Sequence, residues 1–456
     1  MELSRRRLLS TCASAVGGLA CGRLYASSTL HSFDGLLDAF IDARLTAGVI
    51  GGRGVQYWGY NGELPGTTFE TRPGDTLRVH LRNGLPEATN LHFHGLHVSP
   101  SGNADNSFIM VPPGEQFDYE IQIPNDHLSG TFWYHPHVHG VAARQVFHGL
   151  AGLLIVRGDL DAIPEIAAAQ EQVLVLQDFT FDRSGQISEP SFGQRMQGRE
   201  GDTLTVNGEV TPTFSIQRNG LLRCRFLNAS CSRYYQLSVE EHPMAVVAAD
   251  GGPLRTPHWT DKWLLAPGQR VDLLIRGERP AGSYRILSLP YDRGSVGMMG
   301  VSPQSPLVLA YLNYSGTAER AVPVPEKLLN VEALPAAALQ RRFVLTEGMM
   351  GSFQINGRTF RPDRTDTVVE LGSTEDWEIE NRGGMDHPFH MHVNPFQLVG
   401  ADGLADSAFL DVINIPRASR RRIRVRFNDF PGLTLYHCHI LDHEDLGMMG
   451  ILEIRR

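Results

Sequence analysis

Histidines separated by a single residue recur in this sequence, and they suggest a metal site. Random placement would give about one such H-x-H pair in a chain of this composition. Five occur among only 18 histidines, at positions 92/94, 135/137, 137/139, 390/392 and 437/439. On an extended strand, residues two apart project from the same face, so each pair can direct two imidazoles to one side. Copper and zinc favour such nitrogen ligands.

The segment Y-H-C-H-I-L-D-H-E-D-L-G-M-M-G near the C-terminus adds sulfur ligands to the pattern. If His437 and His439 face one metal cluster, Cys438 between them faces the opposite way, towards a site of its own. One thiolate, two imidazoles and a weak thioether make a blue-copper electron-transfer site. The candidate ligands of this second site are Cys438, His443, Met448 and, ahead of the fourth pair, His387.

The chain divides into three blocks with these pairs in only two of them. We expect domains at 44–158, 159–316 and 342–456, with a Pro/Ala-rich linker at 317–341. The pairs occupy the first and third blocks, which predicts one metal cluster clamped between two distant domains.

The sequence predicts mainly strands as the elements that position these histidines. Residues 76–81 and 422–427 alternate apolar and polar side chains, as half-buried strands do. Pro-Gly turns separate such runs, and long amphipathic helix patterns are scarce, which predicts an all-β chain of β-sandwiches. The turns at 73–75 and 267–269 each precede a strand and then an asparagine, which suggests that one sandwich is used repeatedly.

The N-terminus has the features of an export signal. Ser4-Arg5-Arg6-Arg7-Leu8-Leu9 and a mild apolar run to Ala20 predict a twin-arginine signal over 1–28, with a disordered basic tail as the alternative. Cleavage after Ala20 or after Ala26 is open. We therefore expect a periplasmic or secreted protein that meets the twin-arginine export machinery. No later segment is apolar for long enough to span a bilayer, so no membrane partner is expected.

Charge and cysteine content exclude other classes. A net charge of −9 without a basic patch argues against a nucleic-acid partner. Of five cysteines, Cys12 and Cys21 lie in or at the edge of the signal, so a disulfide scaffold is excluded. Cys224 is expected to be a small buried apolar residue, with a bond to Cys231 as the weaker alternative.

Taken together, the four histidine motifs resemble those of the multicopper oxidases, in the three-domain laccase-like branch. Further matching stretches are W-G-Y-N-G at 58–62 with Pro65-Gly66, V-N-G at 206–208 and N-A-S at 228–230. The resemblance covers essentially the whole chain after the signal. It implies three consecutive cupredoxin-like Greek-key β-sandwich domains, of which the third carries the type 1 copper.

The resemblance also implies four copper ions and their ligands by matching position. The type 1 ligands would be His387, Cys438, His443 and Met448. The type 2 ligands would be His92 and His390. One type 3 copper would be held by His94, His135 and His439, and the other by His137, His392 and His437. Met449, beside Met448, is the less favoured axial candidate.

The implied activity is a series of four one-electron oxidations that reduces O2 to two waters. Electrons from the organic substrate would enter at the exposed edge of His443. Asp105 matches the position of a proton-delivering acid, and Glu444 is a second candidate; a turn-capping or solvated carboxylate is the alternative for both. A methionine at the axial position goes with a lower type 1 potential in the family, which favours electron-rich phenols.

We therefore predict a monomeric laccase-like oxidase. Its partners would be O2 and a small aromatic reductant, either a phenol or an aromatic amine. The nearest rival is a periplasmic cuprous-ion oxidase in copper tolerance. The 12 methionines form no methionine-rich segment, which disfavours this rival. Met298-Met299 and Met349-Met350 are expected to pack in cores or interfaces, with weak Cu(I) contact as the alternative. A rival of another class is a copper-free cupredoxin scaffold with a structural role. The length and the middle block without H-x-H pairs disfavour a two-domain oxidase or nitrite reductase.

Histidines outside the matched motifs are expected to be structural. His139 extends the second motif and should lie at the surface or behind the ligands. The others are His31, His80, His97, His127, His148, His242 and His258.

Overall fold

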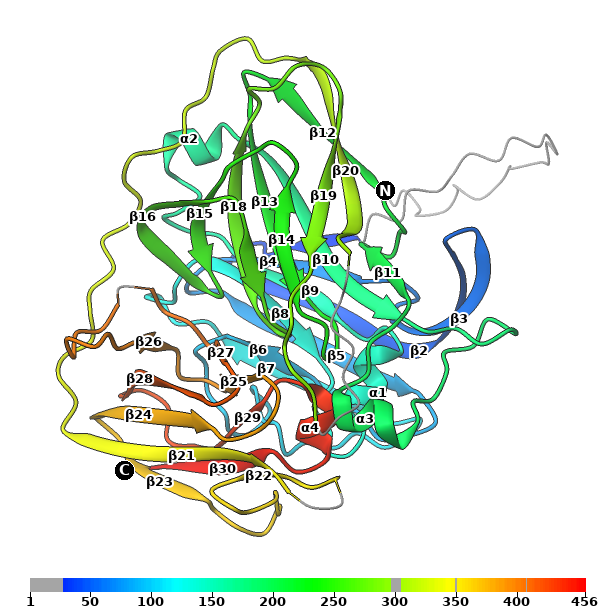
Figure 1. The fold of residues 1–456 in the computed structure, drawn as a ribbon. Coiled ribbons are helices and arrows are strands. Elements are labelled where there is room, and N and C mark those ends of the chain that lie inside the picture. The colour runs from blue at the N-terminus through cyan, green and yellow to red at the C-terminus, as the bar shows by residue number, and fades with distance from the viewer. Residues whose placement is uncertain (1–27, 297–304, 349–350, 407) are drawn as a thin grey trace, which may run out of the picture.

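Three β-sandwiches follow one another along the chain in the computed structural model, as the sequence predicts (Figure 1). The structure describes residues 28–456 except 297–304, 349–350 and 407. The predicted export signal therefore lies outside the described residues apart from Ser28, as do the two Met-Met pairs. The strands form six sheets, two for each sandwich.

The first sandwich is the blue-to-cyan part of Figure 1. One sheet has the order β1 (Thr29–His31), β4 (Gly66–Thr71), β9 (Gly152–Val156), β8 (Gly130–His135) and β6 (His92–His94). The other has the order β3 (Arg53–Tyr60), β2 (Leu36–Ile50), β5 (Thr76–Gly84) and β7 (Gln116–Gln122). In β5 the apolar side chains of Leu77, Val79 and Leu81 are buried, which confirms the predicted alternation.

The second sandwich is the green part at the top of Figure 1. One sheet has the order β11 (Thr203–Val206), β10 (Gln170–Phe179), β13 (Leu221–Asn228), β18 (Arg270–Arg276), β15 (Met244–Ala249) and β16 (Gly252–Thr260). The other has the order β12 (Thr213–Arg218), β20 (Leu307–Thr317), β19 (Ser283–Leu289), β14 (Tyr235–Val239) and β17 (Trp263–Leu265).

The third sandwich is the yellow-to-red part of Figure 1. One sheet has the order β22 (Phe353–Ile355), β21 (Leu339–Glu347), β24 (Ser373–Asn381), β28 (Ser419–Phe427) and β26 (Phe396–Leu398). The other has the order β23 (Thr367–Glu370), β30 (Met449–Arg455), β29 (Gly432–Cys438), β25 (His387–Met391) and β27 (Val412–Ile415). The described helices have four to six residues: α1 (Ala142–Phe147), α2 (Pro164–Ala167), α3 (Phe192–Gln197) and α4 (Leu441–Asp445).

A buried asparagine recurs at the same place in all three sandwiches. Asn228 and Asn381 are the last residues of β13 and β24, and Asn83 is the last but one of β5; these strands pair in parallel with β10, β21 and β2. Each side-chain amide donates to two backbone carbonyls, and each side-chain oxygen accepts the N–H two residues on. The same sandwich is therefore built three times, as the turn pattern suggests for the first two blocks.

Two sandwiches begin earlier than the sequence suggests. The first sandwich includes β1 from Thr29 and β2 from Leu36, ahead of the start predicted at 44, and β21 begins at Leu339, ahead of 342. In β2 the inward positions include Ala39 and Ala43, which are buried but carry too little apolar surface to mark a strand by composition.

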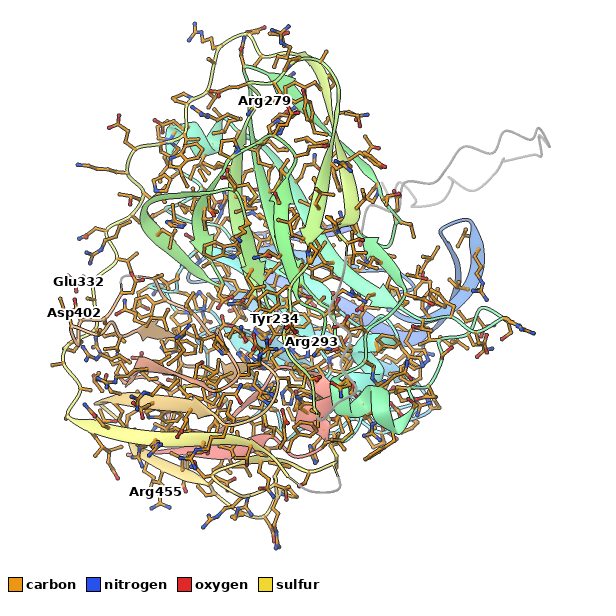
Figure 2. The ribbon with its side chains drawn as sticks, viewed as in Figure 1. Tyr234, Arg279, Arg293, Glu332, Asp402 and Arg455 are labelled. Atoms are coloured by element: carbon orange, nitrogen blue, oxygen red, sulfur yellow. The ribbon has the colours of Figure 1, made fainter. Side chains whose placement is uncertain are left out.

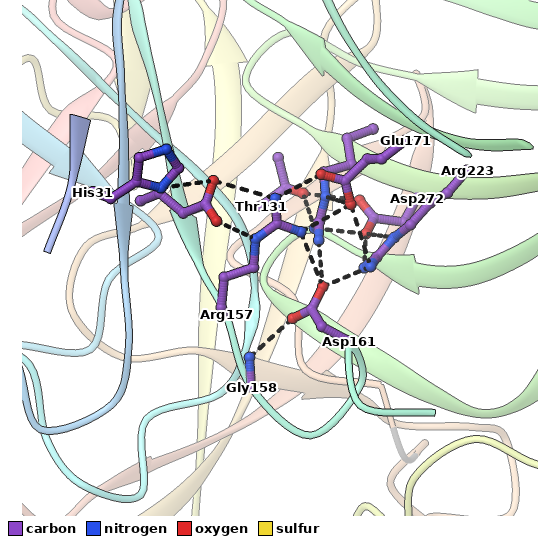
Figure 3. Close-up of polar contacts among 10 residues, drawn as sticks. His31, Thr131, Arg157, Gly158, Asp161, Glu171, Arg223 and Asp272 are labelled. Carbon is purple, nitrogen blue, oxygen red and sulfur yellow. Dashed lines mark hydrogen bonds and ion pairs between the residues drawn. The ribbon is translucent and has the colours of Figure 1, made fainter. Parts of the chain in front are cut away.

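A buried charge network joins the first sandwich to the second (Figure 3). Thr131 of β8 donates to Asp272 of β18, which also accepts from Arg223 and Arg225 of β13. Arg157, just beyond β9, lies between acids of both sandwiches. The acids that complete the network are Glu70, Asp161 and Glu171. Buried charges need such partners, so the network fixes how the two sandwiches dock.

Candidate metal centre

Four strands bring the H-x-H pairs together. His92 and His94 lie in β6, and the register pairs His92 with His135 at the end of the neighbouring β8. In the third sandwich, His390 of β25 pairs with His437 of β29. In β6 the two-residue period directs both imidazoles to the same side, as predicted. In the other three pairs the second histidine lies one or two residues beyond the end of its strand.

The pairs from the first and third sandwiches meet in one buried group, the histidine cluster. Its members are His92, His94, His135, His137, His390, His392, His437 and His439, all at most 2% exposed. The His92 ring stacks on His392 with centroids 3.7 Å apart, and His94 stacks on His390 at 3.8 Å. Sets with nitrogen atoms within 4.8 Å of one another are His92/His94/His135, His92/His390/His392 and His137/His392/His437.

The histidine cluster has the chemistry of a metal site. Burial, reinforced by the neighbouring histidines, lowers the pKa of every imidazole in it, to about 3 for His135 and for His437. Neutral imidazoles keep a lone pair for a metal. Five ring nitrogens of the cluster are buried without a hydrogen-bond partner, which is costly unless a metal ion satisfies them: Nε2 of His92 and of His390, Nδ1 of His137 and both ring nitrogens of His439.

A second group, the cysteine site, lies behind the histidine cluster. Cys438 Sγ is 3.4 Å from Nδ1 of His387 and 4.0 Å from Nδ1 of His443. All three are fully buried and could hold a metal ion. Burial raises the pKa of the Cys438 thiol, so the thiolate requires a neighbouring positive charge such as a metal ion.

The structure separates the two axial candidates. Met448 is fully buried in the same apolar core as Cys438, and its carbonyl accepts the Cys438 N–H at 3.0 Å. Met449 packs instead with Leu435 and Ile451 in a separate small cluster. Met448 therefore shares the core around Cys438, whereas Met449 does not.

The expectation of an exposed His443 edge is wrong. His443 is fully buried, its Nε2 donates to the carbonyl of Met196 at 3.1 Å, and its ring stacks on Phe353 at 3.8 Å. Helix α3, which contains Met196, belongs to the connection between β10 and β11 of the middle sandwich. Ser191 and Gln194 form a capping box at its start, so a short local signal exists. Its position over His443 depends on contacts between domains that the sequence does not encode locally.

The two acids proposed for proton delivery both contact the histidine cluster. Asp105 accepts from Nδ1 of His92 at 3.0 Å and from the backbone N–H of Phe93 at 2.9 Å. Burial raises the pKa of Asp105 to about 8. Glu444 lies 3.1 Å from Nδ1 of His437 and 3.5 Å from Nε2 of His137, and burial raises its pKa well above the ordinary value.

Two residues that contact the histidine cluster were not predicted from the sequence. Asp411 lies 2.8 Å from Nε2 of His94, and the Ser107 hydroxyl lies 3.0 Å from Nδ1 of His392. Asp411 directly precedes the apolar strand β27, and an acid at such a position is the only sequence signal for it.

The remaining predictions concern side chains away from both groups. His139 is exposed beside Phe360 and takes no part in the histidine cluster. Cys224 and Cys231 are both free and buried, so the structure contains no bond between them. Among the described residues, no helix is long and apolar enough to cross a membrane.

Comparisons with known proteins agree with this geometry. Three family models, each described as multicopper oxidase, match residues 44–161, 170–317 and 335–456. "Multicopper oxidase mco" of Staphylococcus haemolyticus is 31% identical over 409 residues, which cover 87% of this chain and 83% of that protein. "Cell division protein FtsP" of Edwardsiella tarda is 31% identical over 402 residues, which cover 83% of each chain. A "Laccase" of Haloferax volcanii is 26% identical over 86% of this chain and 76% of its own.

Solved structures of similar proteins share the whole fold. A multicopper oxidase from Campylobacter jejuni, described as a metallo-oxidase, superposes with a TM-score of 0.84 at 31% identity and covers 94% of both chains. A laccase-like multicopper oxidase from an Ochrobactrum species, described as active towards lignin model compounds, gives 0.82 at 26% identity and covers 94% of this chain and 99% of its own.

Proposed function

Because this chain belongs to the multicopper oxidase family, we propose that it oxidises an external reductant one electron at a time and reduces O2 to two water molecules. The observation that carries the proposal is the placement of Cys438. Its thiol belongs to the cysteine site, while His437 and His439 on either side belong to the histidine cluster. Two covalently connected sites give electrons a short path from one to the other.

The family implies copper, and we propose four ions. The cysteine site would hold the type 1 ion. His92 and His390 would hold the type 2 ion. One type 3 ion would be held by His94, His135 and His439, and the other by His137, His392 and His437. When bound, the copper ions supply the electron transfer and the reduction of O2, which also consumes four protons.

Asp105 and Glu444 are the proposed sources of those protons. Each carboxyl group is buried against ligand histidines, and burial raises the pKa of each, which favours the protonated form. Asp105 also orients its neighbour, because its carboxyl oxygen Oδ1 accepts the Nδ1–H of His92 and leaves Nε2 for the metal.

For the reductant we propose phenols or aromatic amines. A cavity of about 450 Å³ lies beside the cysteine site, with Tyr234, Tyr291 and Arg293 among its lining residues; Figure 2 places Tyr234 and Arg293 together at the centre of the molecule. The Tyr291 hydroxyl donates to Asp386, the residue before His387, at 2.5 Å. The described lining residues include no Met, Cys or His side chain, which suits an organic reductant better than a soft metal ion.

Cuprous ion is the second candidate, and the cover over His443 favours it. Since helix α3 leaves no edge of that imidazole exposed, a bulky ring cannot contact it directly, whereas a small ion needs less room. The likeness to a structure described as a metallo-oxidase points the same way.

The copper-free scaffold remains the rival of another class, because the chain is also similar to a cell division protein. The complete set of candidate ligands argues against it, since a purely structural protein has no use for five buried and unpartnered imidazole nitrogens in the histidine cluster.

One preparation tests all three. The copper-loaded protein is analysed for copper and then assayed for O2 uptake with dimethoxyphenol and with cuprous ion under identical conditions. Four coppers and faster turnover of the phenol support the proposal. Faster turnover of cuprous ion supports the second candidate, and a protein that takes up no copper supports the scaffold. We also propose periplasmic or secreted location, which fractionation of cells with an Arg5→Lys/Arg6→Lys signal variant would test.

A further inference from the structure

The middle sandwich supplies no ligand, yet one of its turns reaches the histidine cluster. Residues 267–269 form the turn that leads into β18. Gly268 has φ +84°, and a Cβ placed there would lie 2.9 Å from the ring of His439. Gln269 donates to the carbonyl of Val412 at 3.1 Å. The turn thus packs against the cluster and against the first residue of β27.

Arg270, the first residue of β18 after this turn, forms a buried ion pair with Asp411. Nη1 donates to Oδ1 at 2.8 Å and Nη2 donates to Oδ2 at 2.5 Å, and both side chains are at most 4% exposed. Nε of Arg270 donates to the carbonyl of Thr131 in the first sandwich. Asp250 accepts from the backbone N–H of Arg270, of Asp411 and of Val412. All three sandwiches therefore meet at this pair.

Asp411 in turn contacts two histidines of the cluster. Its Oδ1 lies 2.8 Å from Nε2 of His94, and its backbone carbonyl lies 2.8 Å from Nδ1 of His390. A carboxylate and a carbonyl can only accept, so each contact requires a proton on that nitrogen. His94 then presents Nδ1 to the cluster, where it is 3.4 Å from Nε2 of His135.

His94 is reversed relative to its neighbours. Five other histidines of the cluster have Nδ1 next to a protein oxygen, which leaves Nε2 for the metal. Their partners are Asp105 for His92, the Pro136 carbonyl for His135, the Asp411 carbonyl for His390, the Ser107 hydroxyl for His392 and the Cys438 carbonyl for His437. Among these six histidines only His94 has a protein oxygen within hydrogen-bonding distance of Nε2. Outside the six, Nε2 of His137 lies 3.5 Å from Glu444.

We propose that Arg270 and Asp411 are positioning residues of the histidine cluster, which would hold the type 2 ion and the type 3 pair and is called the trinuclear site below. The ion pair holds the Nε2–H tautomer of His94 and so directs Nδ1 to the metal. The inference rests on the proposed binding of copper by the histidine cluster. The middle sandwich supplies no candidate ligand, but its Arg270 helps to position the histidines of the proposed oxygen-reducing centre.

The surroundings fit this role. Both oxygens of Asp411 are engaged by Arg270, and one of them also by His94, so the carboxylate is held in one orientation. Gly95, which follows His94, leaves the space for the pair: a Cβ there would lie 2.5 Å from Nη2 of Arg270 and 2.7 Å from Oδ2 of Asp411.

The first test is made on the metal-free protein, where the copper assignment plays no part. Nitrogen-15 NMR of histidine-labelled protein, with His94 assigned from a His94→Gln variant, reports which ring nitrogen carries the proton. We expect Nε2–H in the parent. In Asp411→Asn the amide can donate to His94 and favour the opposite tautomer. A parent with the proton on Nδ1, or a variant that keeps the proton on Nε2, overturns the inference.

The second test measures copper at each site. Loss of a hydrogen bond to a metal-binding histidine typically weakens metal binding about 10- to 100-fold. We expect such a loss at the trinuclear site of Asp411→Asn. The blue absorption band of the type 1 copper, called the blue band below, should stay unchanged. Arg270→Lys keeps the charge but loses the planar fork, so a smaller loss of the same kind is expected. The matched control is Asp376→Asn, which breaks the buried Arg424–Asp376 pair in the sheet of the third sandwich that carries none of the candidate ligand histidines.

The control separates positioning from simple destabilisation. We expect all three variants to lower the melting temperature, but only those at Arg270 and Asp411 to change the trinuclear EPR and absorption signals. Unchanged cluster signals and copper content in Asp411→Asn would contradict the role. A parent that takes up no copper contradicts the proposed function instead, and the tautomer measurement still decides this inference.

Discussion

The carbonyl oxygen of Met196 accepts a hydrogen bond from Nε2 of His443 over 3.1 Å. A residue of the middle sandwich thereby covers His443 of the third sandwich, the histidine at which electrons from the organic substrate were expected to enter. The reductant must pass its electron across helix α3 or beside it, and the cavity at Tyr234 and Tyr291 lies on that side.

Loosening helix α3 is expected to help large reductants. Ser191→Ala removes the helix cap, a loss of about 1 kcal/mol that raises the population with the helix open about fivefold. We expect kcat/KM for bulky phenols to rise by up to that factor and cuprous-ion turnover to change less. Steady-state O2 uptake measures both.

Asp182→Ala is the matched control for the helix cap. Asp182 lies in the same β10–β11 connection and accepts backbone N–H groups of a neighbouring turn, but away from His443. If Ser191→Ala and Asp182→Ala change the bulky-phenol rate equally, the cover over His443 does not limit these substrates.

The axial position is expected to set the potential of the cysteine site. A thioether ligand stabilises the oxidised ion, so Met448→Leu should raise the type 1 potential and extend turnover to less electron-rich phenols. Redox titration of the blue band measures the shift. Met449→Leu packs in the separate cluster and should leave the potential unchanged; equal shifts in the two variants would refute the assignment of Met448.

Proton supply is expected to limit the oxygen half-reaction in two variants. Asp105→Asn and Glu444→Gln each remove a positioned acid, which typically costs about 10²- to 10⁴-fold in rate. Anaerobic bleaching of the blue band by a phenol should keep the parent's rate, while steady-state O2 uptake falls. Asp118→Asn, at an exposed acid beside His80, serves as the control. Parent-like O2 uptake in both variants would exclude these acids as proton donors.

The charge network of Figure 3 is expected to make stability fall in acid. Burial alone would raise the pKa of Glu171, but Arg157 and the neighbouring arginines outweigh it and hold this pKa at about 2. Because the folded pKa lies below the unfolded value of about 4.5, the stabilisation is present above pH 4.5 and is lost as the pH falls towards 2.

Glu171→Gln should therefore flatten the decline in melting temperature between pH 5 and pH 3, as scanning calorimetry would record. Glu240→Gln removes the exposed Glu240–Arg285 pair of the same sandwich and, because solvent screens that pair, should change the decline much less. The network is not the cause of acid sensitivity if Glu171→Gln follows the parent's curve.

The grouping of the histidines could be predicted from the sequence because residues two apart on an extended chain project from one side, as His92 and His94 do in β6. Local chemistry was sufficient for His92/His94 and His437/His439, and for Cys438 between the latter. The Asn83, Asn228 and Asn381 repeat shows that the turn-strand signal reports a real triplication.

Other features depend on contacts between sandwiches and have no local spacing. Asp411 is one acid among 50 acidic residues, and its pairing with Arg270 and His94 arises only after three domains dock. The cover of His443 by helix α3 was missed for the same reason. The alternation of β2 was overlooked because alanine fills two of its inward positions.

The most direct test replaces the sulfur that connects the two sites. Cys438→Ser removes the thiolate and leaves all eight histidines of the cluster in place. The account predicts that the blue band disappears and that O2 uptake with any reductant stops, while copper remains bound at the histidine cluster by EPR. Oxygen consumption at the parent's rate by this variant would contradict it.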